Sequence, residues 1–496
     1  MNHMKYAILL SACLATLIPH AVAATAEMRH THGVFFPGLD NQPVLQLKIT
    51  GKPGEKITSL TFTPGKTTRR NGLKAVRLSS TGHNNAFTTH TANPAQEKAR
   101  QSSVREQFTF NTPFELGDKP LYLWLSYDLS PTIKHNSCVD ALCTSIKMAD
   151  GSVVKPEIKI AKGIEERVIG RVTPYTYRIM PYYRPRWVMG WGNAKEAVHL
   201  TPEHFNRFTD LIHFAYSVNA QGGITYQWAG GKNSQQTVNN ALAEIKRLHK
   251  AAKSDSRLIA GFGHMDAPLT QAIARPAIRR KLAHNMAQWA ITRGNQGIDL
   301  DWEYPENKKQ WNNLGLFLAD LREELAGTGI TISIAASVNY RPPTLSVADQ
   351  IDFILTMSYG SQTAQHASME RYQREANFCV NKLHMAKARI VLGLPFYSNE
   401  QGKLTDQYGY SQIYNWYPNL KPDVNVFRAK KKDGSDGAMH SFNGRKLISE
   451  KCQWAKNNDF GGVMIWAYET DLPLNHHASL GRAMYKVLHQ SRPSKR

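Results

Sequence analysis

The carboxyl-terminal part of the chain alternates eight short apolar runs with segments whose apolar residues recur at helical spacing. One such helical stripe consists of Val238, Leu242, Ile245 and Leu248. Strands that alternate with helices predict parallel βα units, and eight units over about 300 residues predict a (β/α)8 TIM barrel. We assign this barrel domain to residues 185–490. The eight expected strands are residues 187–191, 211–216, 257–262, 297–302, 330–336, 353–359, 390–395 and 461–466.

Residues 28–175 have a different pattern. Short runs alternate apolar and polar residues with a period of two, and Gly, Pro and Asn turns separate them. Regularly spaced short strands are typical of a β-sandwich. We therefore predict a multidomain protein, in which an amino-terminal all-β sandwich precedes the barrel. The expected sandwich strands are residues 44–49, 57–62, 76–78, 107–110 and 121–127.

Three carboxylates, Asp299, Asp301 and Glu303, occupy alternate positions of the fourth expected barrel strand. Side chains at i, i+2 and i+4 share one face of a strand, so the acids form a column at the carboxyl-terminal end of the barrel, where TIM-barrel active sites lie. Neighbouring carboxylates raise one another's pKa, which keeps one acid protonated for proton donation. The alternative is an exposed acidic face on an edge strand, and Trp302 between the acids argues against it.

This run resembles the catalytic signature of family 18 glycoside hydrolases, the chitinases and endo-β-N-acetylglucosaminidases. The signature is Asp-Gly-x-Asp-x-Asp-x-Glu on the fourth barrel strand, and the chain matches it from Gly297 through Glu303 but has Gln296 at the first position. Met357-Ser358-Tyr359 resembles the family's Met-x-Tyr-Asp motif on the sixth strand.

Other positions depart from the family pattern. Gly360 replaces the Asp of the sixth-strand motif, and the third strand ends in Gly261-Phe262-Gly263-His264 where the family often has Ser-x-Gly-Gly. Residues 398–441 follow the seventh strand, where some family members insert an α+β subdomain. We expect this stretch to be loop-like and too short for a full subdomain, which favours an open groove.

The resemblance implies a role for each matching residue. Glu303 would donate a proton to the leaving oxygen, Asp301 would orient the substrate acetamide, and Asp299 would tune Asp301. Tyr359 would hydrogen-bond the acetamide oxygen, and Trp466 would form the floor under the sugar. Further candidates for substrate contact, for which core packing is the alternative, are Met357, Tyr304, Tyr216, Trp191, Tyr397, Trp228, Trp416 and Tyr468.

The implied activity is retaining hydrolysis of β-1,4 bonds at N-acetylglucosamine, through an oxazolinium ion and without metal or cofactor. The implied partners are chitooligosaccharides, the N-glycan core or mucin. Residues 33–38 and 121–127 resemble the sandwich attached to some bacterial sialidases. Together with the net charge of +22 and the expected open groove, this favours host glycans. The rival interpretation is a chitinase-like protein that binds glycans without cleaving them. The sequence has no nucleic-acid motif and no metal-ligand spacing.

The amino terminus has the features of a signal peptide, assigned to residues 1–23. Lys5 precedes an apolar run, and Ala21-Val22-Ala23 offers a cleavage site. We expect a secreted or periplasmic protein, with a surface lipoprotein at Cys13 as the less favoured alternative, and no membrane span elsewhere. The four remaining cysteines allow two disulfides, Cys138–Cys143 and Cys379–Cys452, and the alternative is four free thiols.

Overall fold

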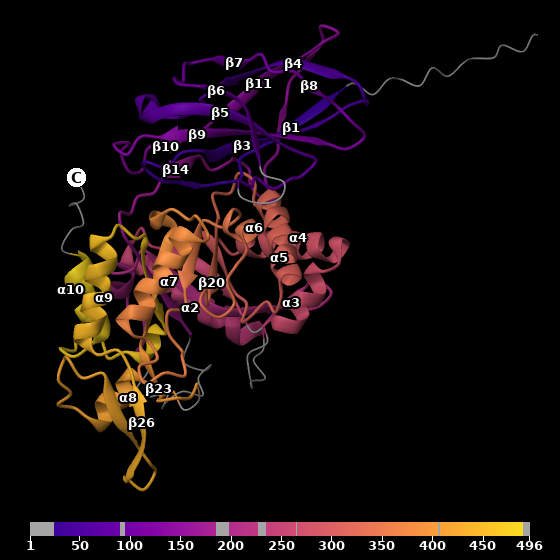
Figure 1. Ribbon diagram of the computed structural model, residues 1–496. Coiled ribbons are helices and arrows are strands. Elements are labelled where there is room, and N and C mark those ends of the chain that lie inside the picture. Colours follow the sequence, from indigo (N-terminus) through magenta and orange to yellow (C-terminus); the bar gives the residue numbers. More distant parts are fainter. Residues whose placement is uncertain are drawn as a thin grey trace, which may run out of the picture.

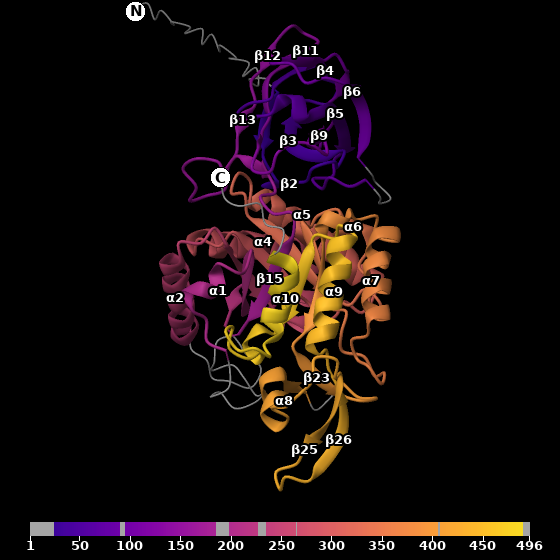
Figure 2. The same ribbon diagram turned by 90° about the vertical axis from the view of Figure 1, so that its left-hand side faces the viewer.

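The computed structural model describes residues 24–89, 95–184, 198–226, 235–263, 265–404 and 407–489. Its β-rich amino-terminal part lies at one end of an α/β barrel, and a small subdomain projects from the other end (Figures 1 and 2). The expected signal peptide lies outside the described residues.

The amino-terminal part is all-β, as the alternating pattern predicts, and is built from two main sheets and a smaller one. The first sheet contains, in spatial order, β13 (Glu157–Ile158), β1 (Thr25–Arg29), β3 (Gln42–Thr50), β9 (Leu121–Leu129), β5 (Leu73–Gly82) and β6 (Gln96–Gln101). The second contains β12 (Val153–Val154), β11 (Leu142–Met148), β4 (Lys56–Thr63) and β7 (Phe108–Phe110), and β8 (Phe114–Glu115) also pairs with β4. The smaller sheet consists of β10 (Cys138–Val139), β14 (Gly170–Val172) and β2 (Val34–Phe35).

Strand β9 is buried along its whole length because both of its faces are covered. Leu123 and Leu125 belong to the core between the sheets. On the opposite face, the ring of Trp124 lies 5.4 Å from Phe87, and its Nε1 donates to the hydroxyl of Thr81 at 2.9 Å.

The barrel is a closed ring of eight parallel strands, which confirms the predicted (β/α)8 fold. Neighbouring strands pair in chain order, and β15 pairs with both β16 and β27 to close the ring. The strands are β15 (Arg178–Tyr183), β16 (Asp210–Val218), β18 (Arg257–Phe262), β19 (Gly297–Asp301), β20 (Thr331–Ala336), β21 (Phe353–Thr356), β22 (Ile390–Pro395) and β27 (Gly462–Trp466); β17 (Ile224–Thr225) forms a hairpin with β16.

The first barrel strand corrects one prediction. The expected strand at residues 187–191 lies outside the described residues, and the ring instead uses β15, which begins upstream of the expected domain start at residue 185. The sequence pattern does not predict β15 as a strand, because Arg178 is charged and Pro181 has no backbone N–H to donate. Arg178 is nevertheless buried, since its Nη1 donates to Asp210 Oδ2 at 2.8 Å.

Helices cover the outside of the ring. Val238, Leu242 and Ile245 of the expected stripe are buried on the inner face of α2. The helices are α1 (Pro202–Phe205), α2 (Gln235–Ala252), α3 (Asp266–Ile273), α4 (Pro276–Thr292), α5 (Lys308–Glu324), α6 (Leu345–Ala348), α7 (Met369–Asn381), α9 (Arg445–Asn457) and α10 (Leu480–Leu488), with short 3-10 turns at Arg70–Gly72, Lys387–Arg389 and Tyr468–Thr470. None of the helices described has the length and apolar character needed to cross a bilayer.

The stretch after β22 is not loop-like, contrary to expectation. It folds into a small subdomain with a four-stranded antiparallel sheet in the order β24-β23-β26-β25 and one helix, and it stands at the barrel end remote from the sandwich (Figure 2). The prediction was wrong because the sequence here is polar and rich in glycine, although it forms strands that pair with one another within the insertion. The elements are β23 (Tyr397–Glu400), β24 (Tyr408–Gly409), α8 (Tyr410–Trp416), β25 (Val426–Lys430) and β26 (Asp436–Ser441).

The sandwich packs on loops that lead into the barrel strands. Gly327, just before β20, donates its backbone N–H to His30 at 2.8 Å and accepts from Val168 at 2.7 Å. Arg29 of the sandwich also pairs with Glu323 of α5 at 3.0 Å. The sandwich therefore covers the amino-terminal end of the barrel strands, opposite to the end at which TIM-barrel active sites lie.

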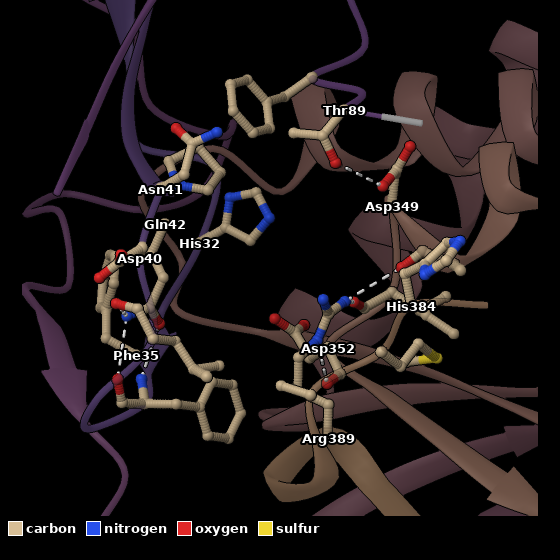
Figure 3. Close-up of a pocket in the computed structure, with 18 of the residues that line it drawn as sticks. His32, Phe35, Asp40, Asn41, Gln42, Thr89, Asp349, Asp352, His384 and Arg389 are labelled. Atoms are coloured by element: carbon tan, nitrogen blue, oxygen red, sulfur yellow. Dashed lines mark hydrogen bonds between the residues drawn. The ribbon is translucent and has the colours of Figure 1, made fainter. Parts of the chain in front are cut away.

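A cavity of about 590 Å³ lies in this interface. Figure 3 shows His32 and Asn41 of the sandwich facing Asp349, His384 and Arg389 of the barrel across it. Arg389 is held by backbone carbonyls, including that of Ala348 at 3.1 Å. The cavity is remote from the carboxylate column, because its barrel residues precede the strands.

The cysteines favour the alternative of unpaired thiols. Among the described residues, Cys138, Cys143, Cys379 and Cys452 are all free.

Candidate active site

The carboxylate column lies at the carboxyl-terminal end of β19. Asp299 and Asp301 are buried, with 0% and 6% of their surface exposed, whereas Glu303, two residues beyond the strand, retains access to solvent. The strand's period of two turns Asp299 and Asp301 to the same face, inside the ring, and Glu303 follows beyond the end of the strand, close enough for its charge to act on Asp301. Two buried carboxyl groups therefore lie behind one that a substrate can reach.

Asp299 accepts hydrogen bonds from both sides of the barrel interior. The hydroxyl of Tyr182, on β15, donates to its Oδ2, and the hydroxyl of Ser333, on β20, donates to its Oδ1 at 2.6 Å. Burial raises the pKa of Asp299 to about 6, and the two hydrogen bonds oppose the rise. Tyr182 and Ser333 are site residues that sequence reasoning missed, since nothing in their local sequence marks them.

Asp301 lies between the other two acids in the sequence of the column. Burial is the largest cause of a pKa well above its usual value, and the negative charges of Glu303, Asp299 and Asp266 raise it further. Its Oδ1 is buried and accepts no hydrogen bond from any residue that the structure describes. Buried polar atoms are rarely left unsatisfied, so this oxygen has the features expected of a ligand contact.

Glu303 retains solvent access, yet enough protein surrounds it that loss of hydration is the main cause of its raised pKa. A hydrogen bond from Tyr304 opposes the rise, and the charge of Asp266 adds to it. Asp266 begins α3 just after the third barrel strand and is exposed at the rim. Sequence reasoning missed Asp266 because it considered only the glycines of that loop; His264 lies outside the described residues.

Tyrosines line the site beside the acids. Tyr359 follows β21, and its ring lies 5.9 Å from that of Tyr397 in an edge-to-face arrangement. Burial, reinforced by Tyr397, Asp301 and Glu303, raises the pKa of Tyr359 well above its usual value. The hydroxyl therefore stays protonated and can donate; its partner here is the Sδ of Met464 at 3.6 Å.

Trp466 ends β27 and is half-buried. The rings of Tyr182 and Phe214 lie at 5.2 and 5.3 Å from its indole, nearly perpendicular to it. The Arg184 guanidinium lies 4.7 Å from the indole centroid, and Arg184 Nε donates to Glu469 Oε1 at 2.6 Å. The indole is thus held by packing and by a cation–π contact, and neither Arg184 nor Glu469 was anticipated from sequence.

The sixth-strand motif lies beside these groups. Met357 is buried, and its carbonyl accepts from Arg371 Nη2 at 3.3 Å. Gly360 has a φ of +72°, a left-handed conformation that an L-residue rarely adopts, and a Cβ placed there would have the hydroxyl of Tyr397 as its nearest neighbour at 3.5 Å. Gly360, which stands where the family motif has Asp, therefore has a backbone conformation suited to glycine.

Three other predicted contacts do not join the acids. Tyr216 packs 4.3 Å from Trp289 of α4, and its hydroxyl shares a hydrogen bond of 2.7 Å with His213, so it belongs to the barrel wall. Trp416 packs on Tyr408 within the subdomain, and Tyr468 is fully buried. Sequence cannot tell which face of the wall such residues occupy. Trp191 and Trp228 lie outside the described residues.

Within the described ranges, no group of three or more His, Cys, Asp or Glu side chains is arranged to hold a metal ion. The chemistry available is that of carboxylic acids, phenols and an indole. One accessible acid of raised pKa can exchange a proton, and a buried acid behind it can bind a polar or positively charged group.

The comparisons with known proteins agree with this geometry. The family described as glycosyl hydrolases family 18 matches residues 178–471, more than half of the chain. Chitinase 1 of Aphanocladium album is 25% identical over 52% of this chain and 75% of its own length, and Endochitinase 1 of Metarhizium anisopliae is 26% identical over 47% of this chain and 66% of its own. A solved chitinase from Bacteroides thetaiotaomicron shares the barrel fold, with a TM-score of 0.51 and 20% identity over 64% of this chain and 97% of that chain.

Proposed function

The chain belongs to family 18 of the glycosyl hydrolases, and we propose on that basis that it hydrolyses β-1,4 bonds beside N-acetylglucosamine with retention of configuration. One observation carries the proposal. Asp301 is a buried acid whose Oδ1 has no partner among the described residues, and it lies directly behind the accessible acid Glu303. This pair suits a reaction in which the substrate supplies its own nucleophile, as in this family.

In the first step, the acetamido carbonyl oxygen of the sugar attacks its own anomeric carbon. The bond to the leaving oxygen breaks as Glu303 transfers its proton to that oxygen, and a cyclic oxazolinium ion forms. Asp301 accepts the acetamide N–H, and in its ionised form it offsets the positive charge, while the protonated hydroxyl of Tyr359 donates to the acetamide oxygen. Trp466 supports the apolar face of the sugar ring.

In the second step, ionised Glu303 takes a proton from water, and the water oxygen attacks the anomeric carbon from the face that the leaving group vacated. The oxazolinium ring opens, the acetamide is restored, and the product keeps its original configuration. Glu303 ends the cycle protonated. No metal or cofactor takes part in the proposed reaction.

We place chitooligosaccharides first among the substrates, because the relatives are named as chitinases. The N-glycan core and mucin chains remain the second candidate class. The open groove that favoured host glycans in the sequence reasoning is not supported, since residues 397–441 form a subdomain at the rim.

The proposed activity is tested by incubating the protein with chitohexaose and, separately, with a high-mannose glycoprotein. We expect shorter chitooligosaccharides whose new reducing ends are initially β, as followed by proton NMR. Release of the glycan from the glycoprotein alone assigns the second substrate class. Binding of chitohexaose by calorimetry without any product identifies the rival, a chitinase-like protein that binds glycans without cleaving them.

We further propose that the chain is exported to the periplasm or the medium and that the sandwich, at residues 28–175, is an accessory module like that of bacterial sialidases. Its position at the barrel end opposite the acids supports an accessory rather than a catalytic role. Cell fractionation tests the export, and glycan-array binding by the intact protein, compared before and after blocking the site with a thiazoline, tests the module.

A further inference from the structure

The cavity between the sandwich and the barrel takes no part in the proposed mechanism. It has a volume of about 590 Å³ and lies between the sandwich and loops that precede barrel strands. Protein interiors have few voids larger than a water molecule, whereas ligand sites are clefts of about 300–1,000 Å³ that occur preferentially at domain interfaces. The size and the place of this cavity are therefore those of a small-molecule site.

Direct hydrogen bonds between the two domains frame the cavity. Gln350 Nε2 donates to the backbone carbonyl of Phe87 at 3.0 Å. The hydroxyl of Thr89 donates to Asp349 Oδ1 at 3.4 Å. Phe87 and Thr89 of the sandwich and Asp349 of the barrel all line the cavity, so it is a defined space between bonded contacts and not a gap left by a loose interface.

The barrel side of the wall presents a fixed donor and a fixed acceptor. Arg389 donates through Nε and Nη2 to the backbone carbonyls of Asp352 and Ala348, at 3.2 and 3.1 Å, and its Nη1 has no acceptor among the described residues. Asp352 Oδ2 accepts from Arg322 and from the backbone N–H of Ile332, both at 2.8 Å. Its Oδ1 has no donor within the described part of the chain.

The sandwich contributes His32, which faces the barrel residues across the cavity (Figure 3). Its Nδ1 shares a hydrogen bond of 3.0 Å with the hydroxyl of Thr31, and its Nε2 has no partner in the residues that the structure describes. Burial, assisted by the charge of Arg322, lowers the pKa of His32 to about 3. The imidazole is therefore neutral, and Nε2 donates or accepts according to its tautomer.

Positive and negative charges at this wall balance each other. Arg322 pairs with Asp352 at 2.8 Å. Burial lowers the pKa of Arg389, and the charges of Asp352 and Asp349 oppose the fall. Two arginines thus stand against two aspartates, which favours an uncharged ligand over an ion.

Much of the remaining lining is apolar, and part of it is aromatic. The cavity opens to solvent beside Asp40 and His384, which are exposed, and Asp40 pairs with Lys74 at 3.0 Å. A ligand can therefore enter from outside and lie against apolar surface. The apolar lining includes Phe35, Phe36, Leu39, Phe87, Ile351 and Met385.

We propose that this cavity binds an uncharged saccharide of one or two rings as a second, non-catalytic ligand, and this does not depend on the proposed function. A sugar hydroxyl donates and accepts hydrogen bonds at once, so it matches Arg389 Nη1 and Asp352 Oδ1 together. The C–H face of a pyranose suits the apolar and aromatic lining. Because such a ligand contacts both domains, it stabilises the folded arrangement in which they meet.

The experiment measures binding of N-acetylglucosamine, chitobiose and galactose to the intact protein by calorimetry, with the catalytic site saturated by a thiazoline. Leu39→Trp and Ala386→Trp fill the cavity from the sandwich and from the barrel. Ala277→Trp, at an exposed residue of α4, is the matched control. We expect saturable binding of at least one sugar to the wild-type protein, and a dissociation constant about tenfold higher or more in both filled variants, because the added ring occupies the ligand's space.

His32→Phe keeps a ring of similar size and removes the polar Nε2, so it is expected to weaken binding of the same sugar. The control Ala277→Trp is expected to bind as the wild-type protein does. A higher melting temperature of the wild-type protein in the presence of the sugar is the second readout.

Absence of saturable binding of all three sugars by the wild-type protein, or unweakened binding by both filled variants, overturns the proposal. Melting temperatures without ligand check that the variants fold; if one filled variant does not fold, the other and His32→Phe decide. Hydrolysis of chitohexaose by Ala386→Trp without the thiazoline is expected to equal that of the wild-type protein. Failure of the cavity site is thereby distinguished from failure of the proposed function.

Discussion

The hydroxyl of Tyr182, on the first barrel strand, donates a hydrogen bond to Asp299, on the fourth strand. Both side chains are buried, and the contact crosses the interior of the ring. Ser333 holds the other oxygen of the same carboxyl group from the fifth strand at 2.6 Å. Asp299 is therefore fixed in orientation by two hydroxyl donors, and it presents its charge or its proton to Asp301 from a constant position.

Tyr182→Phe removes one of these donors and leaves Asp299 Oδ2 buried without it. We expect the free energy of unfolding to fall by about 1–3 kcal/mol, the cost of an unsatisfied buried acceptor. We also expect kcat on chitohexaose to fall roughly tenfold, which corresponds to a rise of about 1.4 kcal/mol in the activation free energy. Denaturant unfolding and steady-state kinetics measure the two effects. Ser333→Ala is the matched variant for the other oxygen, and unchanged kcat in both would show that these hydrogen bonds to Asp299 have no part in catalysis.

Glu303→Gln removes the proposed proton donor with little change in shape. We expect kcat to fall by about 10²–10⁴-fold, the usual contribution of general acid catalysis. The melting temperature is expected to stay the same or rise, because a carboxyl group of raised pKa is replaced by a neutral amide. Glu370→Gln, on the exposed face of α7, is the control; near wild-type turnover by Glu303→Gln would remove Glu303 from the mechanism.

Asp266→Asn tests the electrostatics of the rim. The Asp266 charge raises the pKa of Glu303, so its removal lowers that pKa and reduces the protonated fraction of Glu303 at neutral pH. We expect the alkaline limb of the kcat/KM profile to shift to lower pH, with activity lost at pH values where the wild-type protein still works. A profile that shifts upward or stays in place would contradict this account.

Asp210→Asn tests a buried ion cluster at the base of the barrel. Asp210 pairs with Arg178 at 2.8 Å and with Arg257 at 3.5 Å, so its neutralisation leaves the buried Arg178 and the partly buried Arg257 without this counterion. We expect a loss of about 3–5 kcal/mol in the free energy of unfolding, measured by denaturant titration. The exposed pair Arg247–Glu244 is the matched control, and Glu244→Gln is expected to leave the free energy of unfolding unchanged. Equal losses of stability in Asp210→Asn and Glu244→Gln would contradict the importance of burial.

Much of the barrel was predictable, because each of its strands carries its own local signal. Strand β19 has alternating acids and apolar residues, and the order of βα units around a ring follows from chain order. The exception, β15, carries a buried arginine whose partner Asp210 lies 32 residues away. No local pattern distinguishes that arginine from a solvated one, so no strand was predicted between residues 175 and 185.

The insertion after β22 shows the same difficulty in another form. Its strands are short and polar, and their pairing, such as Asn399 with Ser441, joins segments far apart in the chain. Tyr216 shows a related limit at the site. It has the residue type and strand position of a sugar contact, but its ring faces helix α4 and not the inside of the barrel. Residue type and position along a strand therefore did not suffice to assign a substrate contact.

The sequence by itself determined the identity and spacing of the three acids, the barrel that carries them and the family resemblance, because these depend on neighbours in the chain and on periodicity. Only the tertiary structure decided which hydroxyls hold Asp299, which cation supports Trp466, and that Asp301 is buried with an oxygen that has no partner among the described residues. Those properties arise where separate strands converge on the inside of a closed ring. Hydration is lost there and charges interact strongly, and residue order alone does not specify which side chains meet.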